Sequence, residues 1–221
     1  TGVLVPPQGY LQRLREICTK HGILLIFDEV ITGFGRLGKA TASELVGVTP
    51  DLLTMAKAMN NAAIPMSGVA ASRQVHDTIV NGSAGGAIEF FHGYTYSAHP
   101  VGMAAVNACL SETLRLDLKS NAAARGTQLY NGLKTLQEEF DVIGDVRGGH
   151  GLMAAIELVS DRGTKTPMDM PSLKRAHKAC YQSGTMVRMG GNNLLMSPPL
   201  TLTEADVSKI LDDLRVGLKA I

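Results

Sequence analysis

The sequence lacks a dominant charge, tryptophan and any paired arrangement of cysteines. Its 21 Lys and Arg residues balance 20 Asp and Glu residues, so the net charge is +1. A balanced charge provides no electrostatic attraction for nucleic acid or for an anionic membrane. Cys18, Cys109 and Cys180 lie far apart, without CxxC or Cys/His spacing. This argues against a zinc site and indicates reduced thiols in a cytoplasmic protein.

Long apolar runs and a leader segment are also missing. No stretch approaches the roughly 18 apolar residues of a membrane span, and no basic segment precedes an apolar one, so neither a spanning helix nor a signal peptide is expected. Position 1 is Thr, so we expect a processed, trimmed or incomplete N-terminus. The 221 residues, 45% of them hydrophobic, suffice for one or two domains with a core.

The order of apolar patterns predicts an α/β fold. Helical spacing over residues 8–21 is followed by Gly22 and a continuous apolar run at 23–27, which is typical of a strand buried on both faces in a parallel sheet. A second apolar run, 52–56, ends on Lys57. Helix followed by buried strand is the pattern of α/β proteins.

The pattern changes near residue 141. From there a glycine-rich turn joins two strands, and later segments predict a helix near 173–183, strands near 186–187 and 194–196, and a helix opened by Thr203 with Asp206 in an imperfect capping box. We therefore predict two domains, residues 1–140 and a smaller α+β domain at 141–221.

Asp28 ends the first apolar run. A carboxylate at the carboxyl end of a buried strand lies where α/β sheets bind ligands. Val30 is two residues further on and is expected on the same strand face, where it could support a ligand that Asp28 contacts. A cap, a turn or a salt bridge with Arg36 is the structural alternative for Asp28.

Lys57 ends the second apolar run and has no acidic residue within five positions on either side. Apolar surroundings desolvate an ammonium group and favour its neutral form, which an imine-forming amine requires. A lysine that extends into solvent from a strand end is the alternative. Because Asp28 and Lys57 follow consecutive strands, they could face one crevice.

Several motifs resemble those of class III aminotransferases, which use pyridoxal 5'-phosphate (PLP). The two main blocks are LIFDEVITGFGR at 25–36 and PDLLTMAKA at 50–58, and FHGYTYSAHP at 91–100 resembles a third. Within the family, the segments at 60–66 and 88–94 are most similar to the omega-amino-acid branch, of the beta-alanine:pyruvate transaminase type. The resemblance covers essentially the whole chain and implies a fold-type I PLP-dependent transferase.

Residue roles follow from this resemblance. It implies that Lys57 holds PLP as an internal aldimine and moves the proton during transamination. Asp28 would pair with the pyridinium nitrogen and keep it protonated, and Val30 would pack against the ring. Thr95 matches the threonine that binds the PLP phosphate of the neighbouring subunit, which implies a homodimer or a dimer of dimers. A strand threonine is the alternative for Thr95.

Arg188 matches the family arginine that receives the substrate carboxylate, for which a planar guanidinium is suited. A surface arginine is the alternative. Arg147, in the block VRGGHG at 146–151, is interpreted as structural. The implied reaction transfers an amino group from an omega-amino acid or amine to pyruvate, so the partners are small molecules and not nucleic acid or a membrane.

The family's first half has no counterpart in this sequence. That half carries most of the phosphate-binding residues and the aromatic residue on the outer face of the ring. We therefore expect this chain to be the C-terminal half of such an enzyme, with apolar strand faces and edges left uncovered.

Three other functions remain open. Another class III transaminase or an aminomutase would share Asp28 and Lys57. The chain could instead be a fragment without catalytic activity that binds no PLP. A nicotinamide-dependent enzyme is disfavoured, because no GxGxxG follows a strand.

Overall fold

The computed structural model describes residues 2–82, 85, 90 and 92–221. They divide into two compact units. Unit 1 comprises Thr1–Pro6, Gly35–Gly38 and Leu118–Ile221, and unit 2 comprises Pro7–Phe34 and Lys39–Asp117. The sequence predicts a boundary near residue 140. The structure divides instead before residue 118, because the long helix that starts there buries one face in the core of unit 1.

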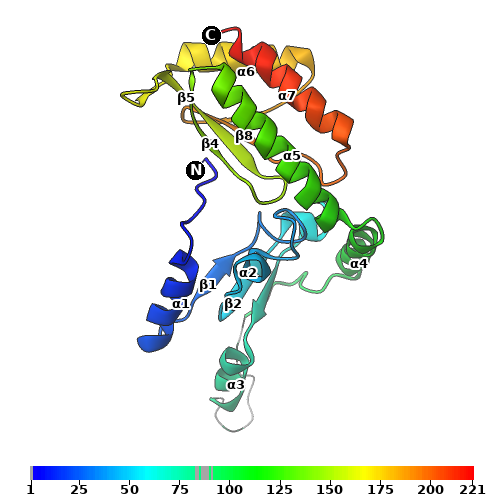
Figure 1. Cartoon of the computed structure of the whole chain (residues 1–221). Coiled ribbons are helices and arrows are strands. Elements are labelled where there is room, and N and C mark those ends of the chain that lie inside the picture. The colour runs from blue at the N-terminus through cyan, green and yellow to red at the C-terminus, as the bar shows by residue number, and fades with distance from the viewer. Residues whose placement is uncertain (1, 83–84, 86–89, 91) are drawn as a thin grey trace. The chain divides into compact units, whose positions relative to one another are not determined.

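Unit 2 is built on a three-stranded sheet of order β1–β2–β3 (Figure 1). β1 and β2 are parallel, and β3 is antiparallel to β2. α1 packs on one face of β1, where Cys18, Leu25 and Val48 form a small core. The elements of unit 2 are α1 (Tyr10–Lys20), β1 (Ile26–Asp28), α2 (Ala42–Val46), β2 (Leu52–Met55), the 3-10 helix η1 (Lys57–Met59), β3 (Gly68–Ala71), α3 (Arg73–Asn81) and α4 (Pro100–Arg115).

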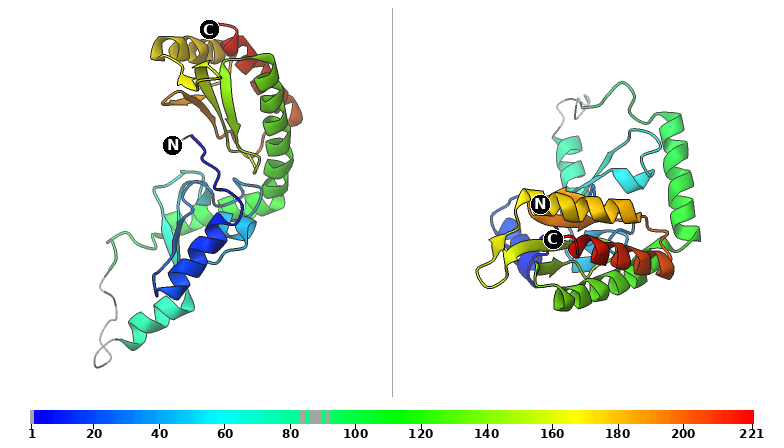
Figure 2. Two further views of the ribbon diagram at one scale, coloured as in Figure 1. Left: turned by 60° about the vertical axis from the view of Figure 1, so that its left-hand side comes forward. Right: turned by 90° about the horizontal axis from the view of Figure 1, so that it is seen from above.

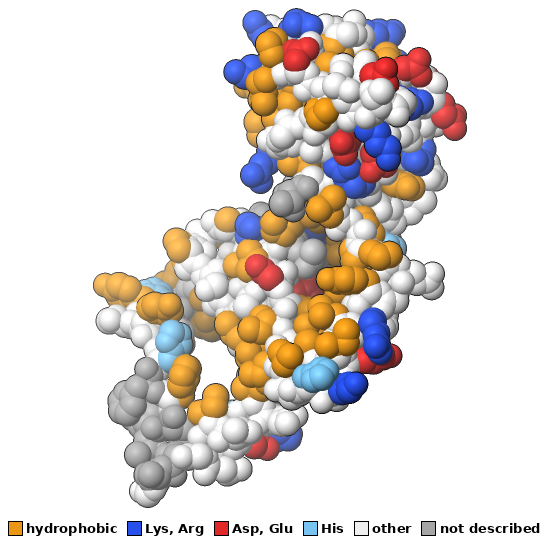
Figure 3. Space-filling view, turned by 90° about the vertical axis from the view of Figure 1, so that its left-hand side faces the viewer, with side chains coloured by type: hydrophobic (Ala, Val, Ile, Leu, Met, Phe, Trp, Pro, Cys, Tyr) orange, Lys and Arg blue, Asp and Glu red, His pale blue; other side chains and the backbone are white. Residues whose placement is uncertain are grey.

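The face of β1 opposite α1 is exposed. Leu24 and Ile26 are 56% and 55% exposed, whereas Leu25 between them is 6% exposed. The prediction of a strand buried on both faces is therefore wrong for this chain, and the prediction of an uncovered apolar strand face is confirmed. Figure 3 shows hydrophobic side chains gathered over the surface of unit 2.

Unit 1 is an antiparallel sheet with helices on one face, the α+β arrangement that the sequence predicts for the C-terminal part. The strands follow the order β4–β5–β8–β7, with β6 paired to β5. Residues of α5, α6 and α7 share a single core with one face of the sheet (Figures 1 and 2). The elements are α5 (Leu118–Glu139), β4 (Ile143–Arg147), β5 (Ala154–Asp161), β6 (Thr166–Pro167), α6 (Met170–Ser183), β7 (Arg188–Gly190), β8 (Asn193–Met196) and α7 (Glu204–Leu218).

Some features were not anticipated. β7 begins at Arg188, two residues later than the start of the strand predicted at 186–187. The prediction does not include the short elements α2 and β6. In the segment 81–86, whose Gly and Ser residues are typical of a loop, residues 83, 84 and 86 lie outside the described residues. Within the described part of the chain, none of the helices combines the length and apolar character needed to cross a membrane.

Candidate functional site

Asp28 and Lys57 lie at one edge of the unit 2 sheet. In the parallel pairing of β1 with β2, Asp28 is opposite Thr54. β1 ends at Asp28 and β2 ends at Met55, two residues before Lys57. Because the carboxyl ends of parallel strands share an edge, the acid and the amine belong to the edge where α/β sheets bind ligands.

One oxygen of the Asp28 carboxylate is fixed by the chain itself. Oδ1 accepts hydrogen bonds from the Val30 backbone N–H at 3.0 Å and from Thr54 Oγ1 at 3.1 Å. Among the described residues, Oδ2 has no hydrogen-bond partner. Asp28 therefore makes a turn bond to Val30, as one of the structural alternatives for this residue predicted. Arg36 belongs to unit 1 and donates to the carbonyls of Leu152 and Pro198.

Val30 does not lie on the strand face predicted for it. β1 ends at Asp28, and Val30 is in the turn that follows. The alternation of side chains holds only while a strand continues, so the predicted shared face is wrong. The backbone N–H of Val30, rather than its strand position, connects it to Asp28.

Glu29 organises the turn after Asp28, a role that the sequence patterns do not predict. The side chain is 1% exposed. Its carboxylate accepts from Thr32 Oγ1 at 2.6 Å and from the backbone N–H groups of Ala42 and Ser43, both at 2.8 Å. Sequence patterns do not reveal this role, because two of its partners, Ala42 and Ser43, lie 13 and 14 residues further along the chain.

Lys57 lies in the left-handed region of backbone space, with φ of +44°. This conformation is unfavourable for a residue with a Cβ atom and is enriched at functional sites. The side chain is exposed. The described residues of unit 2 therefore do not desolvate the ammonium group, and the exposed position agrees with the alternative of a lysine that extends into solvent.

Asn60 holds the loop that follows Lys57. It is 2% exposed, and its side-chain amide donates to the carbonyl of Ile64 at 2.7 Å and accepts from the N–H of Ala62 at 3.1 Å. The N–H groups of Asn60 and Ala62 both donate to the carbonyl of Lys57 at 3.3 Å. These bonds keep the backbone of Lys57 in its strained conformation.

Thr95 lies in an exposed turn and not in a strand, so the strand alternative is wrong. The turn is closed by the Ser97 N–H, which donates to the Tyr94 carbonyl at 2.9 Å, and the Tyr94 N–H donates to Ser97 Oγ at 3.0 Å. His99 then caps α4, since its Nδ1 accepts from the Val101 N–H at 3.2 Å. Phe91, which belongs to the same motif, lies outside the described residues.

Arg188 belongs to unit 1, whereas Asp28, Lys57 and Thr95 belong to unit 2. It opens β7, is exposed and lies opposite Leu195 of β8. No ion pair to its guanidinium is found in the part of the chain that the structure describes. Arg188 borders an open cavity of about 790 Å³ whose lining is mostly apolar. A free guanidinium beside apolar surface can receive a small organic carboxylate.

The described residues contain no group of three His, Cys, Asp or Glu side chains arranged to hold a metal ion. The chemistry available at the sheet edge is that of one carboxylate and one amine. The amine is a potential nucleophile, and the carboxylate can accept a hydrogen bond from a ligand or balance its positive charge.

Known proteins are similar to this chain in sequence and in fold. The class III aminotransferase model matches residues 1–218. An omega-aminotransferase of Caulobacter vibrioides is 45% identical over 215 residues, which are 97% of this chain and 47% of the relative. A beta-alanine–pyruvate aminotransferase of Pseudomonas aeruginosa is 44% identical over 221 residues, which are 100% of this chain and 48% of the relative.

Solved structures agree with these relatives. An amine transaminase from an uncultivated Pseudomonas species, in its PLP-bound internal aldimine form, superposes with a TM-score of 0.94 at 42% identity. The match covers 99% of this chain and 49% of that one. An (S)-enantioselective omega-transaminase from Thermomicrobium roseum has a TM-score of 0.90 at 38% identity, with 99% and 48% covered.

The chain spans about half the length of the curated relatives it matches. The predicted α/β class is confirmed, because the matching structures are transaminases of the fold-type I architecture. The resemblance to the omega-amino-acid branch is confirmed by the relatives named above. A family match over residues 1–218, together with relatives more than 40% identical, shows that the chain belongs to the class III aminotransferases.

Proposed function

We propose that the protein carrying this chain transfers an amino group from an omega-amino acid or amine to pyruvate, with PLP as its cofactor. The observation that carries the proposal is the placement of Asp28 and Lys57 at one edge of two parallel strands. The names of the relatives from Caulobacter vibrioides and Pseudomonas aeruginosa support the donor class, and the latter supports pyruvate as the acceptor.

The Asp28 carboxylate fits the ring nitrogen of PLP. When bound, PLP supplies an electron-accepting ring that stabilises negative charge at the substrate carbon. Asp28 Oδ2 would accept the hydrogen bond of the ring N–H, while Val30 N–H and Thr54 Oγ1 hold Oδ1 and prevent the carboxylate from rotating away. A fixed negative charge there would keep the ring nitrogen protonated. Val30 would contact the ring.

The Lys57 amine would hold the cofactor covalently and, after the amino donor displaces it, would move the proton from the substrate carbon. Both tasks need a side chain that starts from a fixed backbone position. The loop held by Asn60 provides this, because it fixes the backbone of Lys57 from the C-terminal side.

Arg188 and Thr95 complete the proposed assignment. The guanidinium of Arg188 would receive the carboxylate of beta-alanine or pyruvate, and the adjoining apolar cavity would take the carbon chain. The Thr95 hydroxyl, exposed in its turn, would bind the PLP phosphate of a neighbouring subunit, so the protein would act as a homodimer or a dimer of dimers. We further propose a reducing, cytoplasmic location, which the free thiols of all three cysteines support.

The first test is chemical trapping. The protein expressed from its complete gene is mixed with PLP and reduced with borohydride, and the modified peptide is identified by mass spectrometry. We expect the label on Lys57, no label in Lys57→Ala and an unchanged label in Lys39→Ala, a control at an exposed loop lysine. No label, or a label that persists in Lys57→Ala, would sink the PLP assignment.

The donor profile tests the substrate class. We expect alanine to form from pyruvate with beta-alanine or a simple amine as donor. A preference for 2-oxoglutarate over pyruvate would favour another class III transaminase, and migration of the amino group within one molecule would indicate an aminomutase.

A further inference from the structure

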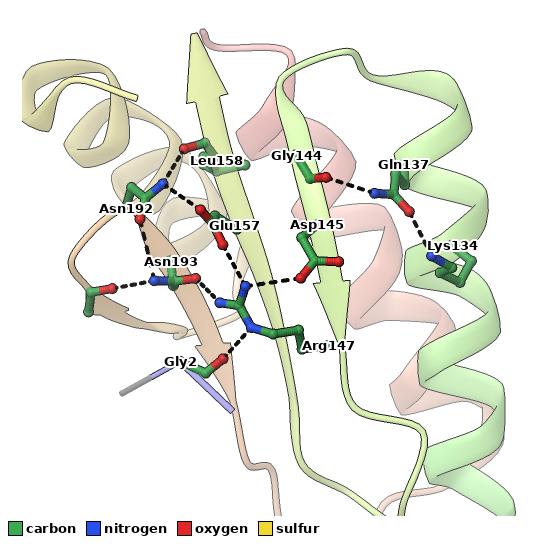
Figure 4. Close-up of polar contacts among 11 residues, drawn as sticks. Gly2, Lys134, Gln137, Gly144, Asp145, Arg147, Glu157, Leu158, Asn192 and Asn193 are labelled. Atoms are coloured by element: carbon green, nitrogen blue, oxygen red, sulfur yellow. Dashed lines mark hydrogen bonds and ion pairs between the residues drawn. The ribbon is translucent and has the colours of Figure 1, made fainter. Parts of the chain in front are cut away.

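Arg147 is the centre of a polar cluster on the sheet of unit 1 (Figure 4). Its side chain is 14% exposed. Its Nη1 donates to Glu157 at 2.5 Å and to Asp145 at 3.1 Å, its Nε donates to the Gly2 carbonyl at 2.7 Å, and its Nη2 donates to Asn193 Oδ1. A guanidinium has enough donors in fixed directions for all four acceptors, and a lysine ammonium does not.

The cluster connects four strands in one row. Asp145 on β4 lies beside Glu157 on β5, and Glu157 lies opposite Asn193 on β8. Asn193 in turn lies opposite Gly190 on β7. Arg147 therefore ties the first two strands of the sheet to the turn that joins the last two.

Asn193 transmits this link to the β7–β8 hairpin. While its Oδ1 accepts from Arg147, its Nδ2 donates to the carbonyl of Gly190 at 2.9 Å. The turn next to it contains Gly191 with φ of +60°. The neighbouring Asn192 donates to the Leu158 carbonyl at 2.8 Å and to Glu157 at 3.4 Å, which anchors the same turn to β5.

Arg188 is on this hairpin and on the same face as the cluster. It lies opposite Leu195, and Asn193 is two residues from Leu195, so both Arg188 and Asn193 point to one side of the sheet. Among the described strands β7 pairs with β8 alone, through three residue pairs. On the N-terminal side of Arg188 the chain is anchored to α6, where His177 Nε2 contacts the Val187 carbonyl at 2.9 Å. The turn anchors the hairpin on the other side of Arg188, so both anchors set the direction of the guanidinium.

We propose that Arg147, acting through Asn193, is a positioning residue that fixes the β7–β8 hairpin so that Arg188 receives the substrate carboxylate. This inference rests on the proposed function, because it needs Arg188 to bind that carboxylate. Arg147 itself touches neither substrate nor cofactor. Its role predicts an effect confined to substrates that carry a carboxylate.

The test compares two donors that differ in this group. The donor half-reaction is followed without pyruvate, with beta-alanine or with n-propylamine, which has no carboxylate. We expect Arg147→Lys and Asn193→Ala each to raise KM for beta-alanine, here the donor concentration that gives half the limiting rate of the half-reaction, about tenfold. The limiting rate constant for beta-alanine and both constants for n-propylamine should not change. Calorimetry with propionate supplies a second readout, in which binding weakens by a similar factor.

Two further variants make the outcomes distinct. Arg215→Lys is the matched control, because Arg215 binds Glu139 at 2.9 and 3.1 Å between helices of the same unit, without contact to the hairpin. This variant should leave the kinetic constants for both donors unchanged. Arg188→Lys should raise KM for beta-alanine at least as much as Arg147→Lys.

The positioning role would be overturned if Arg147→Lys and Asn193→Ala raised KM equally for both donors, or for neither donor. The proposed function would remain intact in both cases. An unchanged KM for beta-alanine in Arg188→Lys would instead remove Arg188 from the proposed function, and the positioning role with it. If Arg147→Lys fails to fold, the result for Asn193→Ala alone tests the positioning role, because this variant keeps the Arg147–Glu157 ion pair.

Discussion

Lys57 is held in a backbone conformation that lysine rarely adopts. Such strain persists when the surrounding hydrogen bonds over-determine the backbone, as those of Asn60 do here. If the amine at this position serves catalysis, the protein retains a side chain where glycine would be more stable. Stability and activity are then in conflict at this residue.

This conflict can be measured without cofactor. We expect Lys57→Gly to be more stable than Lys57→Ala by about 1 kcal/mol, because glycine adopts positive φ without a steric penalty. The measurement is urea-induced unfolding of the 221-residue chain. Lys20, in the last turn of α1, is the matched control, and there the alanine variant should be the more stable. Equal stabilities of the two Lys57 variants would contradict the strain.

A second prediction concerns the anchoring of Asp28. Thr54→Val keeps the shape of the side chain but removes its hydroxyl donor to Oδ1. We expect kcat of the complete-gene protein to fall about tenfold, and Asp28→Asn to lower it about 10²–10³-fold, since the charge itself is lost. Thr19→Val, at a threonine bonded to Arg15 on α1, should not alter kcat. A Thr54 variant with full activity would show that the carboxylate needs no anchor.

Sequence patterns located Asp28 and Lys57 because each follows a local apolar run. Thr54 was not anticipated, because its bond to Asp28 depends on the register of two strands 26 residues apart. The exposure of Lys57 was also unpredictable, because neighbours in sequence say little about which surfaces the folded chain covers.

At the scale of elements, α6 and α7 approach closely around Cys180. A Cβ atom added to Gly217 would lie 2.2 Å from Cys180 Sγ and 2.8 Å from the Ala176 carbonyl, so only glycine permits this contact. Burial of the thiol, together with the nearby charge of Asp213, raises the pKa of Cys180 to about 11. The same contact that joins the helices therefore keeps the thiol protonated.

The raised pKa predicts a loss of stability in alkali. The unfolded thiol ionises near its ordinary pKa of 9.0, while the folded thiol keeps its proton to about 11. The unfolded state thus binds fewer protons in this window, and the free energy of unfolding falls as pH rises. At pH near 11 the loss should reach about 2 kcal/mol relative to Cys180→Ala. The measurement is the free energy of unfolding of both proteins at several pH values. If it changed equally in the two proteins from pH 8 to 11, the raised pKa of Cys180 would be refuted.

Helix ends were more predictable than strand ends. Thr203 and Asp206 form both bonds of a capping box, because the cap depends only on residues three positions apart. The apolar pattern predicts the start of β7 two residues too early, because the limits of β7 are set by pairing with β8 rather than by its own composition. α2 was missed, since one turn of helix gives no periodic signal.

At the scale of the whole molecule, the uncovered face of β1 governs the behaviour of the isolated chain. Leu24 and Ile26 expose apolar side chains beside a strand edge, a combination that promotes association. The family assignment and the α+β character of the C-terminal part can be predicted from motifs and periodicity. The membership of α5 in unit 1 was not, because it depends on burial against distant strands.

We expect the 221-residue chain to associate in solution, and the double variant Leu24→Glu, Ile26→Glu to reduce this association. Light scattering as a function of concentration measures the effect. Leu25→Glu is the contrasting variant, because Leu25 is buried in the small core and its replacement should unfold unit 2. A monomeric parent chain would contradict the role assigned to the exposed face.

Arg36 also constrains the order of events during translation. Its guanidinium binds the carbonyl of Pro198 at 2.5 Å, across 162 positions of the chain. At about 5–20 residues per second, a ribosome needs roughly 8–30 s to proceed from one partner to the other. Arg36 can bind Leu152 earlier, but it lacks Pro198, the later of its two partners, until the end of that interval. Unit 1 can therefore complete its contacts only after Pro198 has been synthesised.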